Sequence, residues 1–216
     1  MQYFDLSQPI YDDCPNCPAH PPVKVEIIAT HAQHDWHMEL LTLASHTGTH
    51  LDAPLHKLAG GRSLDSYPLE TFAGKAFVAD LTGCRADHAI TAEDLKARLP
   101  ADVTDSVVLL NTGWGHKRAK TEEWQFHSPF LSAEGAQWLV DHQIRGVGID
   151  HFSIGGMKEP GNARTHEILL GAGVWIVEEL CFRDGWEAIL PHATFQALPI
   201  SARGFSGAPC RAVLVY

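Results

Sequence analysis

Short runs of hydrophobic residues recur along the chain and predict a series of β-strands. Hydrophobic and polar residues alternate over 23–28, which is typical of a strand with one buried face. The run 106–110 is almost entirely apolar and indicates a strand that is covered on both faces. Residues 38–43 predict another strand, which leads into a histidine-rich stretch. Further strands are expected at 76–81, 146–150, 174–177 and 211–215.

Two segments carry the signals that begin and end a helix. Thr91 precedes a run with acidic residues in its first turn and a proline beyond its end, which predicts a helix over 91–99. Ser132 caps a second predicted helix, which lies between the strands at 106–110 and 146–150. This order of strand, helix and strand is a βαβ unit, so we expect a parallel pair of strands joined by a right-handed crossover.

The length and composition indicate one folded unit. With 216 residues the chain can bury one sizeable core, so a single α/β domain over 1–216 is expected. Hydrophobic residues make up 45% of the chain and charged residues 19%, which is ordinary for a globular protein and unlike a disordered one. Residues 11–22 are rich in proline, so 1–22 are expected to form an irregular N-terminal arm.

The charge and the apolar runs argue against two classes of partner. A formal net charge of -10 is unfavourable for binding nucleic acid, which normally meets a basic surface. No run approaches the ~18 apolar residues that are needed to span a membrane. The N-terminus lacks the basic and apolar regions of a signal peptide. We therefore expect a cytoplasmic protein with neither a nucleic-acid nor a membrane partner.

Two of the five cysteines have a suggestive spacing. Cys14 and Cys17 form a C-x-x-C pair, which is typical of redox motifs and zinc sites. However, Pro18 follows where a redox motif would continue as a helix, and no second pair completes a zinc ribbon. A proline-rich loop is the interpretation we favour, with a redox or structural zinc role as the alternative. The other cysteines stand far apart and are expected to be reduced thiols.

The stretch 46–56 contains the densest group of potential metal ligands. His46, His50, Asp52 and His56 all occupy even positions, so an extended backbone would place their side chains on one face. Imidazole and carboxylate ligands together suit a borderline divalent cation such as zinc or manganese. The alternative is a polar loop whose histidines make hydrogen bonds, because 14 histidines will cluster in places by chance.

Further ligands are expected from distant segments, because catalytic metal sites usually combine several strand ends and loops. His166 opens a short helical segment, predicted at 166–170, after a glycine- and proline-rich loop. Glu178 ends the apolar strand at 174–177, where an unpaired buried carboxylate would be costly. Glu179 is its rival, since alternation would turn one of the two outward. The pattern alone does not decide between the two glutamates. The alternative for His166 is a role in capping a helix, and the alternative for Glu178 or Glu179 is a solvated position at the end of the strand.

These residues bring the chain close to a known family. The segment from His46 to His56 resembles the HxGTHxDxPxH signature of the putative cyclase family, which includes bacterial kynurenine formamidase and isatin hydrolase. The similarity then continues in order over nearly the whole chain, through residues 111–114, 147–150, 153–154, 166–180 and 208–213.

The resemblance implies a specific metal centre. His46, His50 and Asp52 would hold one ion, and Asp52 would bridge to a second ion held by His166. Glu178, and not Glu179, matches the family acid that bridges both ions, so one or two zinc or manganese ions per subunit are expected. His56 matches the residue that donates and accepts protons, which makes His56 and Glu178 the expected catalytic residues.

The resemblance also implies a fold and an assembly. The family fold is a single compact α/β domain of the swivelling β/β/α type with a central barrel-like mixed sheet. Its members are usually dimers or higher oligomers, in which an N-terminal arm can help to close the partner's pocket. We therefore expect a homodimer or homotetramer.

The expected function is metal-dependent hydrolysis of an amide, either an aryl formamide or a cyclic amide. Metal-activated water would attack, with His56 as general acid and base. A lactone or other cyclic ester hydrolase and a non-catalytic metal- or ligand-binding relative are the alternatives. Kynurenine formamidases carry an aromatic residue before a Pro-Gly-Asp in the arm, and Cys14 is expected to replace it here. Trp36, Trp114 and Phe152 are candidates for lining an aromatic pocket instead.

Overall fold

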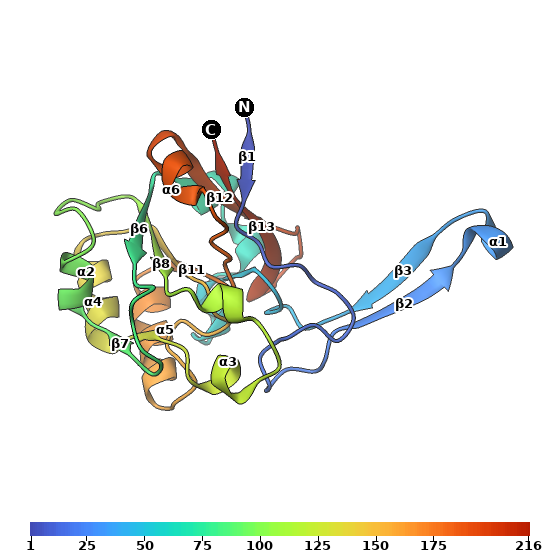
Figure 1. Ribbon diagram of the computed structural model, residues 1–216, viewed down its shortest axis with the longest axis horizontal. Coiled ribbons are helices and arrows are strands. Elements are labelled where there is room, and N and C mark those ends of the chain that lie inside the picture. The colour runs from blue at the N-terminus through green and yellow to red at the C-terminus, as the bar shows by residue number, and fades with distance from the viewer.

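A nine-stranded mixed sheet forms the centre of the computed structural model, which describes residues 1–216 (Figure 1). The sheet curls into a nearly closed, barrel-like shape, as the resemblance implied. From one edge to the other its strands are β5 (Ala73–Gly74), β12 (Thr194–Pro199), β13 (Gly207–Val215), β4 (His50–Asp52), β11 (Trp175–Glu178), β10 (Gly146–Ile149), β8 (Val107–Asn111) and β6 (Ala76–Asp80). Strand β1 (Tyr3–Asp5) pairs with β13, so the two chain ends lie side by side.

The sheet has a parallel half and an antiparallel half. Strands β6, β8, β10 and β11 run parallel to one another, which confirms the parallel pair expected for 106–110 and 146–150. Strand β4 pairs antiparallel with β11 on one side and with β13 on the other. The two halves therefore meet at β4, which is only three residues long and carries two of the predicted ligands.

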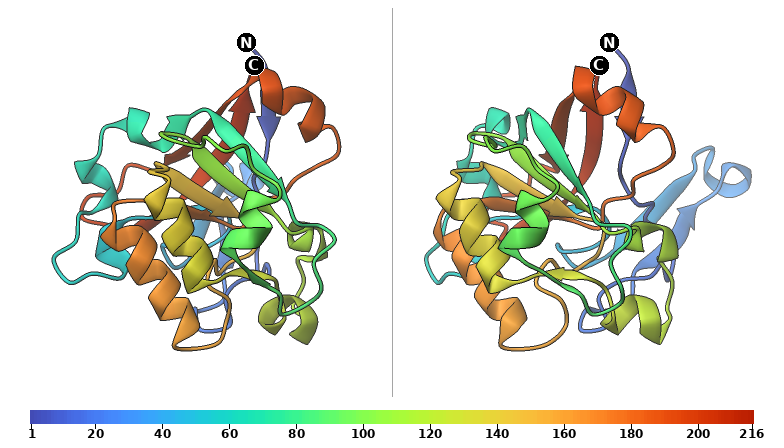
Figure 2. Two further views of the ribbon diagram at one scale, coloured as in Figure 1. Left: turned by 90° about the vertical axis from the view of Figure 1, so that its left-hand side faces the viewer. Right: turned by 60° about the vertical axis from the view of Figure 1, so that its left-hand side comes forward.

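Helices cover one side of the parallel half, where Figure 2 shows them packed together. They are α2 (Ala92–Lys96), α4 (Ala133–Asp141) and α5 (Gly161–Gly171). The predicted caps are present, because the side chains of Thr91 and Ser132 accept hydrogen bonds from backbone N–H groups in the first turns of α2 and α4. Apolar residues of these helices pack on the sheet in one core cluster, and a second cluster fills the curl of the barrel.

The hairpin of β2 (Lys24–Ala29) and β3 (Met38–Thr42) projects from this body, with α1 (His31–His34) at its tip (Figure 1). A half-buried strand was expected at 23–28, and this is wrong: most side chains of β2 and all of those of β3 are exposed. The two strands pair with each other, and only Val25 and Ala29 of the hairpin strands are at least partly shielded from solvent. Trp36, for example, is 74% exposed.

Three other segments differ from the predictions. The 46–56 stretch is not one extended strand: Gly48 has a positive φ of 63°, β4 covers only three residues, and a 3-10 turn follows at Pro54–His56. His166 lies inside α5 rather than at its start. Strand β12, which ends at Pro199, is an additional strand that the sequence did not lead us to expect.

The remaining elements are short. Strands β7 (Ala89–Ile90) and β9 (Phe130–Leu131) form a separate parallel pair, α3 (Glu122–Phe126) lies in the excursion between β8 and β9, and α6 (Trp186–Ile189) precedes β12. No helix is both long and apolar enough to cross a membrane.

Candidate metal centre

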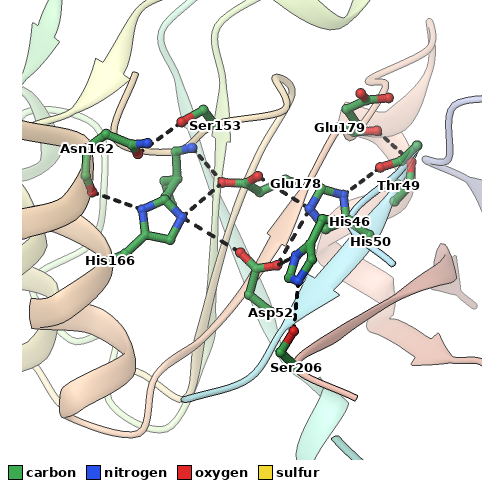
Figure 3. A network of polar contacts seen from close by, with 12 residues as sticks. His46, Thr49, His50, Asp52, Ser153, Asn162, His166, Glu178, Glu179 and Ser206 are labelled. Atoms are coloured by element: carbon green, nitrogen blue, oxygen red, sulfur yellow. Dashed lines mark hydrogen bonds and ion pairs between the residues drawn. The ribbon is translucent and has the colours of Figure 1, made fainter. Parts of the chain in front are cut away.

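The pairing of β4 with β11 brings the first half of the chain to the second. His50 lies directly opposite Glu178, and Asp52 lies opposite Ile176. Because side chains two apart on a strand share a face, His50 and Asp52 point to the same side as Glu178 (Figure 3). His166 reaches the same place from α5, so that two sequence segments more than 100 residues apart form one site.

Asp52 is the centre of this site and is fully buried. Its Oδ1 accepts a hydrogen bond from His46 Nδ1 at 2.6 Å and lies 3.5 Å from His50 Nε2. Its Oδ2 lies 3.8 Å from His166 Nε2 and has no hydrogen-bond partner. A buried carboxylate oxygen without a partner is costly and is expected to meet a cation.

Glu178 mirrors Asp52 across the site. Its Oε2 lies 3.5 Å from His50 Nε2 and its Oε1 lies 3.6 Å from His166 Nε2. The backbone N–H of Ile154 donates to Oε1 at 2.6 Å, which fixes the carboxylate. Two ligand atoms that are each about 2.1 Å from a tetrahedral ion lie about 3.4 Å apart. The observed separations therefore leave room for a cation among the side chains of Asp52, Glu178, His50 and His166.

The histidines are oriented from behind. His50 donates from Nδ1 to the carbonyl of Gly48 at 2.7 Å, and His166 donates from Nδ1 to the carbonyl of Asn162 at 2.9 Å. Each imidazole is thereby turned so that Nε2 faces the carboxylates. Second hydrogen bonds of this kind are typical of metal-binding histidines, because they fix the tautomer and the ring.

The groups form two overlapping sets of potential ligand atoms that share Asp52. The first consists of His46, Asp52 and His56, and the second of His50, Asp52 and Glu178; within each set the atoms lie within 4.8 Å of one another. The structure thus brings together all five predicted ligands, with His166 beside the second set. Their role in holding a metal stays a prediction.

The electrostatics reflect this crowding. Burial alone would lower the pKa of His50 and of His166, but Glu178 and Asp52 outweigh it and raise both pKa values to about 9. Burial alone would raise the pKa values of Asp52 and Glu178, but the surrounding imidazoles hold both below their ordinary range. The site without a cation is therefore held together by proton-mediated pairs of imidazole and carboxylate.

His56 occupies the open side of the site. Its ring centroid lies 3.9 Å from that of His46 and 5.7 Å from that of His166. Desolvation lowers the pKa of His56, and the charges of His46 and His166 lower it further, although Asp52 acts in the opposite direction. His56 is exposed, unlike the deeper imidazoles, so the geometry allows it to act either as a proton carrier or as an outer ligand.

Gly207 on β13 contributes by close approach. It lies opposite Asp52 on β4, and a Cβ at this position would come within 2.2 Å of the ring of His46. Ser206 precedes it and its hydroxyl lies 3.1 Å from His46 Nε2. The beginning of β13 therefore leaves space for the ring of His46, at Gly207, and offers it a hydrogen-bond partner, at Ser206.

Glu179 is not part of this group. The two acids were expected to point one inward and one outward, but Glu179 is buried too, with its carboxylate 3.0 Å from the guanidinium of Arg118. It has a left-handed backbone conformation, with φ of 52°, which turns its side chain away from Glu178. The burial of Glu179 was not expected from the sequence, because its ion-pair partner Arg118 comes from a distant loop.

A cavity of ≈350 Å³ opens above the candidate metal centre. Its apolar wall consists of Cys17, Ala19, Phe152, Met157 and Ala163. Polar residues outside the ligand group complete it: His20, Lys57, Ser153, Glu159 and Asn162. Most of these residues were missed, because they carry no motif and only the folding of the arm and of the loop before α5 brings them here.

Of the three aromatic residues predicted to line a substrate pocket, only one lines the cavity. Phe152 lines the cavity, as predicted for an aromatic wall. Trp114 does not: it is buried behind Phe152, and its indole N–H donates to the carbonyl of Trp124 at 3.3 Å. Trp36 lies on the projecting hairpin and does not reach the cavity of its own chain.

The two cysteines of the arm lie in different surroundings. Cys17, and not Cys14, lines the cavity and packs against the cluster of Trp114, Trp124 and Phe152. Cys14 is buried elsewhere, and both residues are free thiols. The correspondence of Cys14 with the family's aromatic residue stays a prediction, but it is Cys17 that contributes to the cavity wall.

Comparison with known proteins agrees with this geometry. Residues 4–155 match the model of a family described as Putative cyclase. Two solved structures are each 31% identical to the chain with a TM-score of 0.78. One is a potential metal-dependent hydrolase with cyclase activity, with 99% of this chain and 96% of that chain covered. The other is a predicted metal-dependent hydrolase from Bacillus stearothermophilus, with 99% and 97% covered.

A third solved structure is similar over the same extent. Isatin hydrolase A from Labrenzia aggregata, bound to benzyl benzoate, is 25% identical with a TM-score of 0.83, and 99% of this chain and 93% of that chain are covered. The likeness thus spans the β4 to β11 pairing and both ends of the candidate site.

Proposed function

The chain belongs to the putative cyclase family, and on this premise we propose that it is a metal-dependent hydrolase that cleaves the carbon–nitrogen bond of an amide. The observation that carries the proposal is the buried pair of Asp52 and Glu178, which share His50 and His166 while Asp52 Oδ2 has no partner. Core packing does not explain such a group, because two adjacent buried carboxylates repel each other and are costly to remove from water.

The donor set fits a divalent cation. His46, His50 and Asp52 would hold one ion, and His166 and Glu178 would hold a second or complete the first. Imidazole nitrogen and carboxylate oxygen are common ligands of zinc and are also compatible with manganese. A bound ion would supply an activated water at neutral pH and would polarise the substrate carbonyl.

Proton transfer is the role we assign to His56. Its lowered pKa keeps the imidazole neutral near pH 7, so a ring nitrogen can accept the proton of the attacking water. The same nitrogen can return this proton to the leaving amide nitrogen, which makes departure of a neutral amine possible. The exposed position of His56 at the mouth of the cavity gives it access to both.

The substrate we propose is a small aromatic or cyclic amide, such as an aryl formamide or a lactam fused to a ring. The cavity of ≈350 Å³ is suited to a molecule of that size. Phe152, Met157 and Cys17 offer an apolar wall beside the metal centre, which is favourable for a ring. Similarity to isatin hydrolase A, at 25% identity, supports the cyclic amide in particular.

We further propose that the active form is a homodimer in which the β2–β3 hairpin packs against a second copy of this chain. An isolated two-stranded hairpin is marginal in water, and here Ile27, Trp36 and Leu41 are each at least 50% exposed. The hairpin that carries them projects from the body (Figure 1), which suits packing against another subunit.

The decisive experiment is a hydrolysis assay on chelator-treated protein before and after addition of zinc or manganese. Isatin, N-formylkynurenine, a simple cyclic imide and an aryl lactone form the substrate panel, and elemental analysis gives the ions per subunit. We expect amide hydrolysis that depends on metal and is lost in Asp52→Asn. Equal rates in metal-free and metal-loaded protein, or no turnover of any amide in the panel, would refute the proposal.

A further inference from the structure

The N-terminal arm forms a wall of the cavity above the metal centre, although it makes no strand with the sheet there. Cys17, Ala19 and His20 line this cavity, and the ring of His20 lies 6.5 Å from that of His46. Residues 11–22 contain almost no regular structure, so the position of this wall depends on side-chain contacts rather than on a backbone ladder.

One arginine with a buried side chain supplies two of those contacts. Arg118 donates to the carbonyl of Pro9 at 2.9 Å and to the carbonyl of Pro15 at 2.8 Å. Its Nε donates to Glu179 Oε2 at 3.0 Å. The side chains of Arg118 and Glu179 are only 6% and 1% exposed, so this pair is shielded from solvent. Arg118 thus holds the arm at two points and is itself anchored by an acid next to Glu178.

A second link joins the arm to the ligand stretch. The hydroxyl of Thr49 accepts from the backbone N–H of Gln8 at 2.8 Å and donates to the carbonyl of Glu179 at 2.5 Å (Figure 3). Thr49 precedes His50, and Glu179 follows Glu178. The arm is therefore attached to the two residues that adjoin the candidate ligands His50 and Glu178.

We propose that Arg118 is a positioning residue, which together with Glu179 fastens the arm as the substrate-facing wall of the cavity. Loss of this clamp frees Cys17, Ala19 and His20 to move away from the cavity without disturbing the metal ligands. A buried charged group that ties two backbone carbonyls to a carboxylate has the strength for this, because charge-assisted hydrogen bonds are the stronger kind. The kinetic part of this inference rests on the proposed function, and the structural part does not.

Cys17 provides a direct reading of the position of the arm. In Arg118→Lys the shorter, single-headed amine can keep the pair with Glu179 but cannot reach both proline carbonyls as well. We expect N-ethylmaleimide to modify Cys17 about 10- to 100-fold faster in this variant, the factor that corresponds to loss of one charge-assisted hydrogen bond. Peptide mapping by mass spectrometry would report each cysteine separately, with the distant, half-buried Cys84 as the reference.

The matched control is Lys120→Ala. Lys120 pairs with Asp13 of the same arm, but both side chains are exposed, so this surface ion pair contributes little. We expect Cys17 to react in this variant at the wild-type rate. Equal acceleration in Lys120→Ala would overturn the proposal, because it would show that any change near the arm loosens it.

A second variant guards against a failure to fold. Glu179→Gln keeps the size of the side chain and weakens the anchor of Arg118, and it should accelerate the modification of Cys17 as well. In either variant a folded protein with unchanged Cys17 reactivity refutes the inference. Unfolding of both variants also counts against it, because the pair would then serve the whole fold rather than the arm.

Kinetics distinguish positioning from a merely structural role. For a substrate that the wild type hydrolyses, Arg118→Lys should raise KM about tenfold while kcat changes less than about threefold, since the ligands and His56 are untouched. Metal content should equal that of the wild type. If no amide is hydrolysed by the wild type, the proposed function fails while the thiol experiment still decides the role of Arg118.

Discussion

His50 and Glu178 lie opposite each other on neighbouring antiparallel strands, with Nε2 and Oε2 3.5 Å apart although the residues are 128 positions apart in the sequence. This cross-strand pair joins the ligand-rich stretch to the second half of the chain. It also makes the candidate centre depend on the register of β4 with β11, because a shift by one residue would turn Glu178 away from it.

The first prediction concerns Glu178. We expect Glu178→Gln to bind zinc or manganese at least about 10-fold more weakly than the wild type, because an amide carries no charge to offset that of the cation. Titration calorimetry on chelator-treated protein measures this. Glu167→Gln is the control, since Glu167 is exposed on α5, the helix that carries His166, and should bind as the wild type does. Wild-type affinity in Glu178→Gln would remove this residue from the site.

The second prediction is a release of protons on metal binding. In the metal-free protein His50 and His166 have pKa values of about 9 and are mostly protonated at pH 7, whereas a ligand must be neutral. The affinity for the metal should therefore rise by roughly ten- to a hundred-fold per pH unit between pH 7 and 8, for one or two displaced protons. Calorimetry in buffers of different ionisation enthalpy counts these protons. An affinity that is independent of pH in this range would contradict the assignment.

The same pKa values predict how the stability of the metal-free protein depends on pH. Both imidazoles have a higher pKa in the folded protein than the ordinary value of about 6.5, so their stabilising effect is complete below that pH and is lost as the pH rises through about 9. Thermal unfolding should show a falling Tm over this range. Saturation with metal should remove the decline, because the cation then replaces the protons.

The third prediction separates the two roles open to His56. If it carries protons, His56→Ala should keep the metal content and lose about 10²- to 10⁴-fold in kcat. His50→Ala, by contrast, should lose metal. Loss of metal in His56→Ala would instead make His56 a ligand beside His46 and Asp52, a role that their spacing allows.

The fourth prediction concerns the assembly. Replacing Ile27 and Leu41 by glutamate puts charge on the exposed hairpin and should convert the proposed dimer into a monomer without lowering Tm by more than a few degrees. Light scattering after size-exclusion chromatography gives the mass. Glu39→Gln is the control on the same hairpin, because it removes no apolar surface. A wild-type protein that is already monomeric would exclude this proposal.

The local part of the site could be predicted from the sequence, and the wall above it could not. His46, His50, Asp52 and His56 lie within eleven residues, so their proximity follows from the chain itself. His166 and Glu178 come together with them only through strand pairing and helix packing, and the choice of Glu178 over Glu179 needed the family pattern. Cys17 and His20 reach the cavity because a distant arginine holds the arm, a contact that no local pattern reveals.

The fold shows the same division. The parallel strands β8 and β10 were predicted well because continuous apolar runs and a capped helix between them are local signals. The exposure of the β2–β3 hairpin was not predicted, since alternation indicates a strand but does not say whether anything covers it. The sequence likewise does not distinguish Trp36, which lies on the hairpin, from a pocket residue, because an aromatic residue alone carries no signal of where it will lie.

Gly207 makes the metal centre depend on a position that has no functional group. Because the ring of His46 occupies the space that any Cβ at 207 would need, even alanine there would displace the imidazole or push β13 away from β4. A larger residue at this backbone position is therefore possible only if the imidazole of His46 or the strand moves. The shape of the strand next to the ligands therefore limits which sequences can hold the centre as strictly as the ligands themselves do.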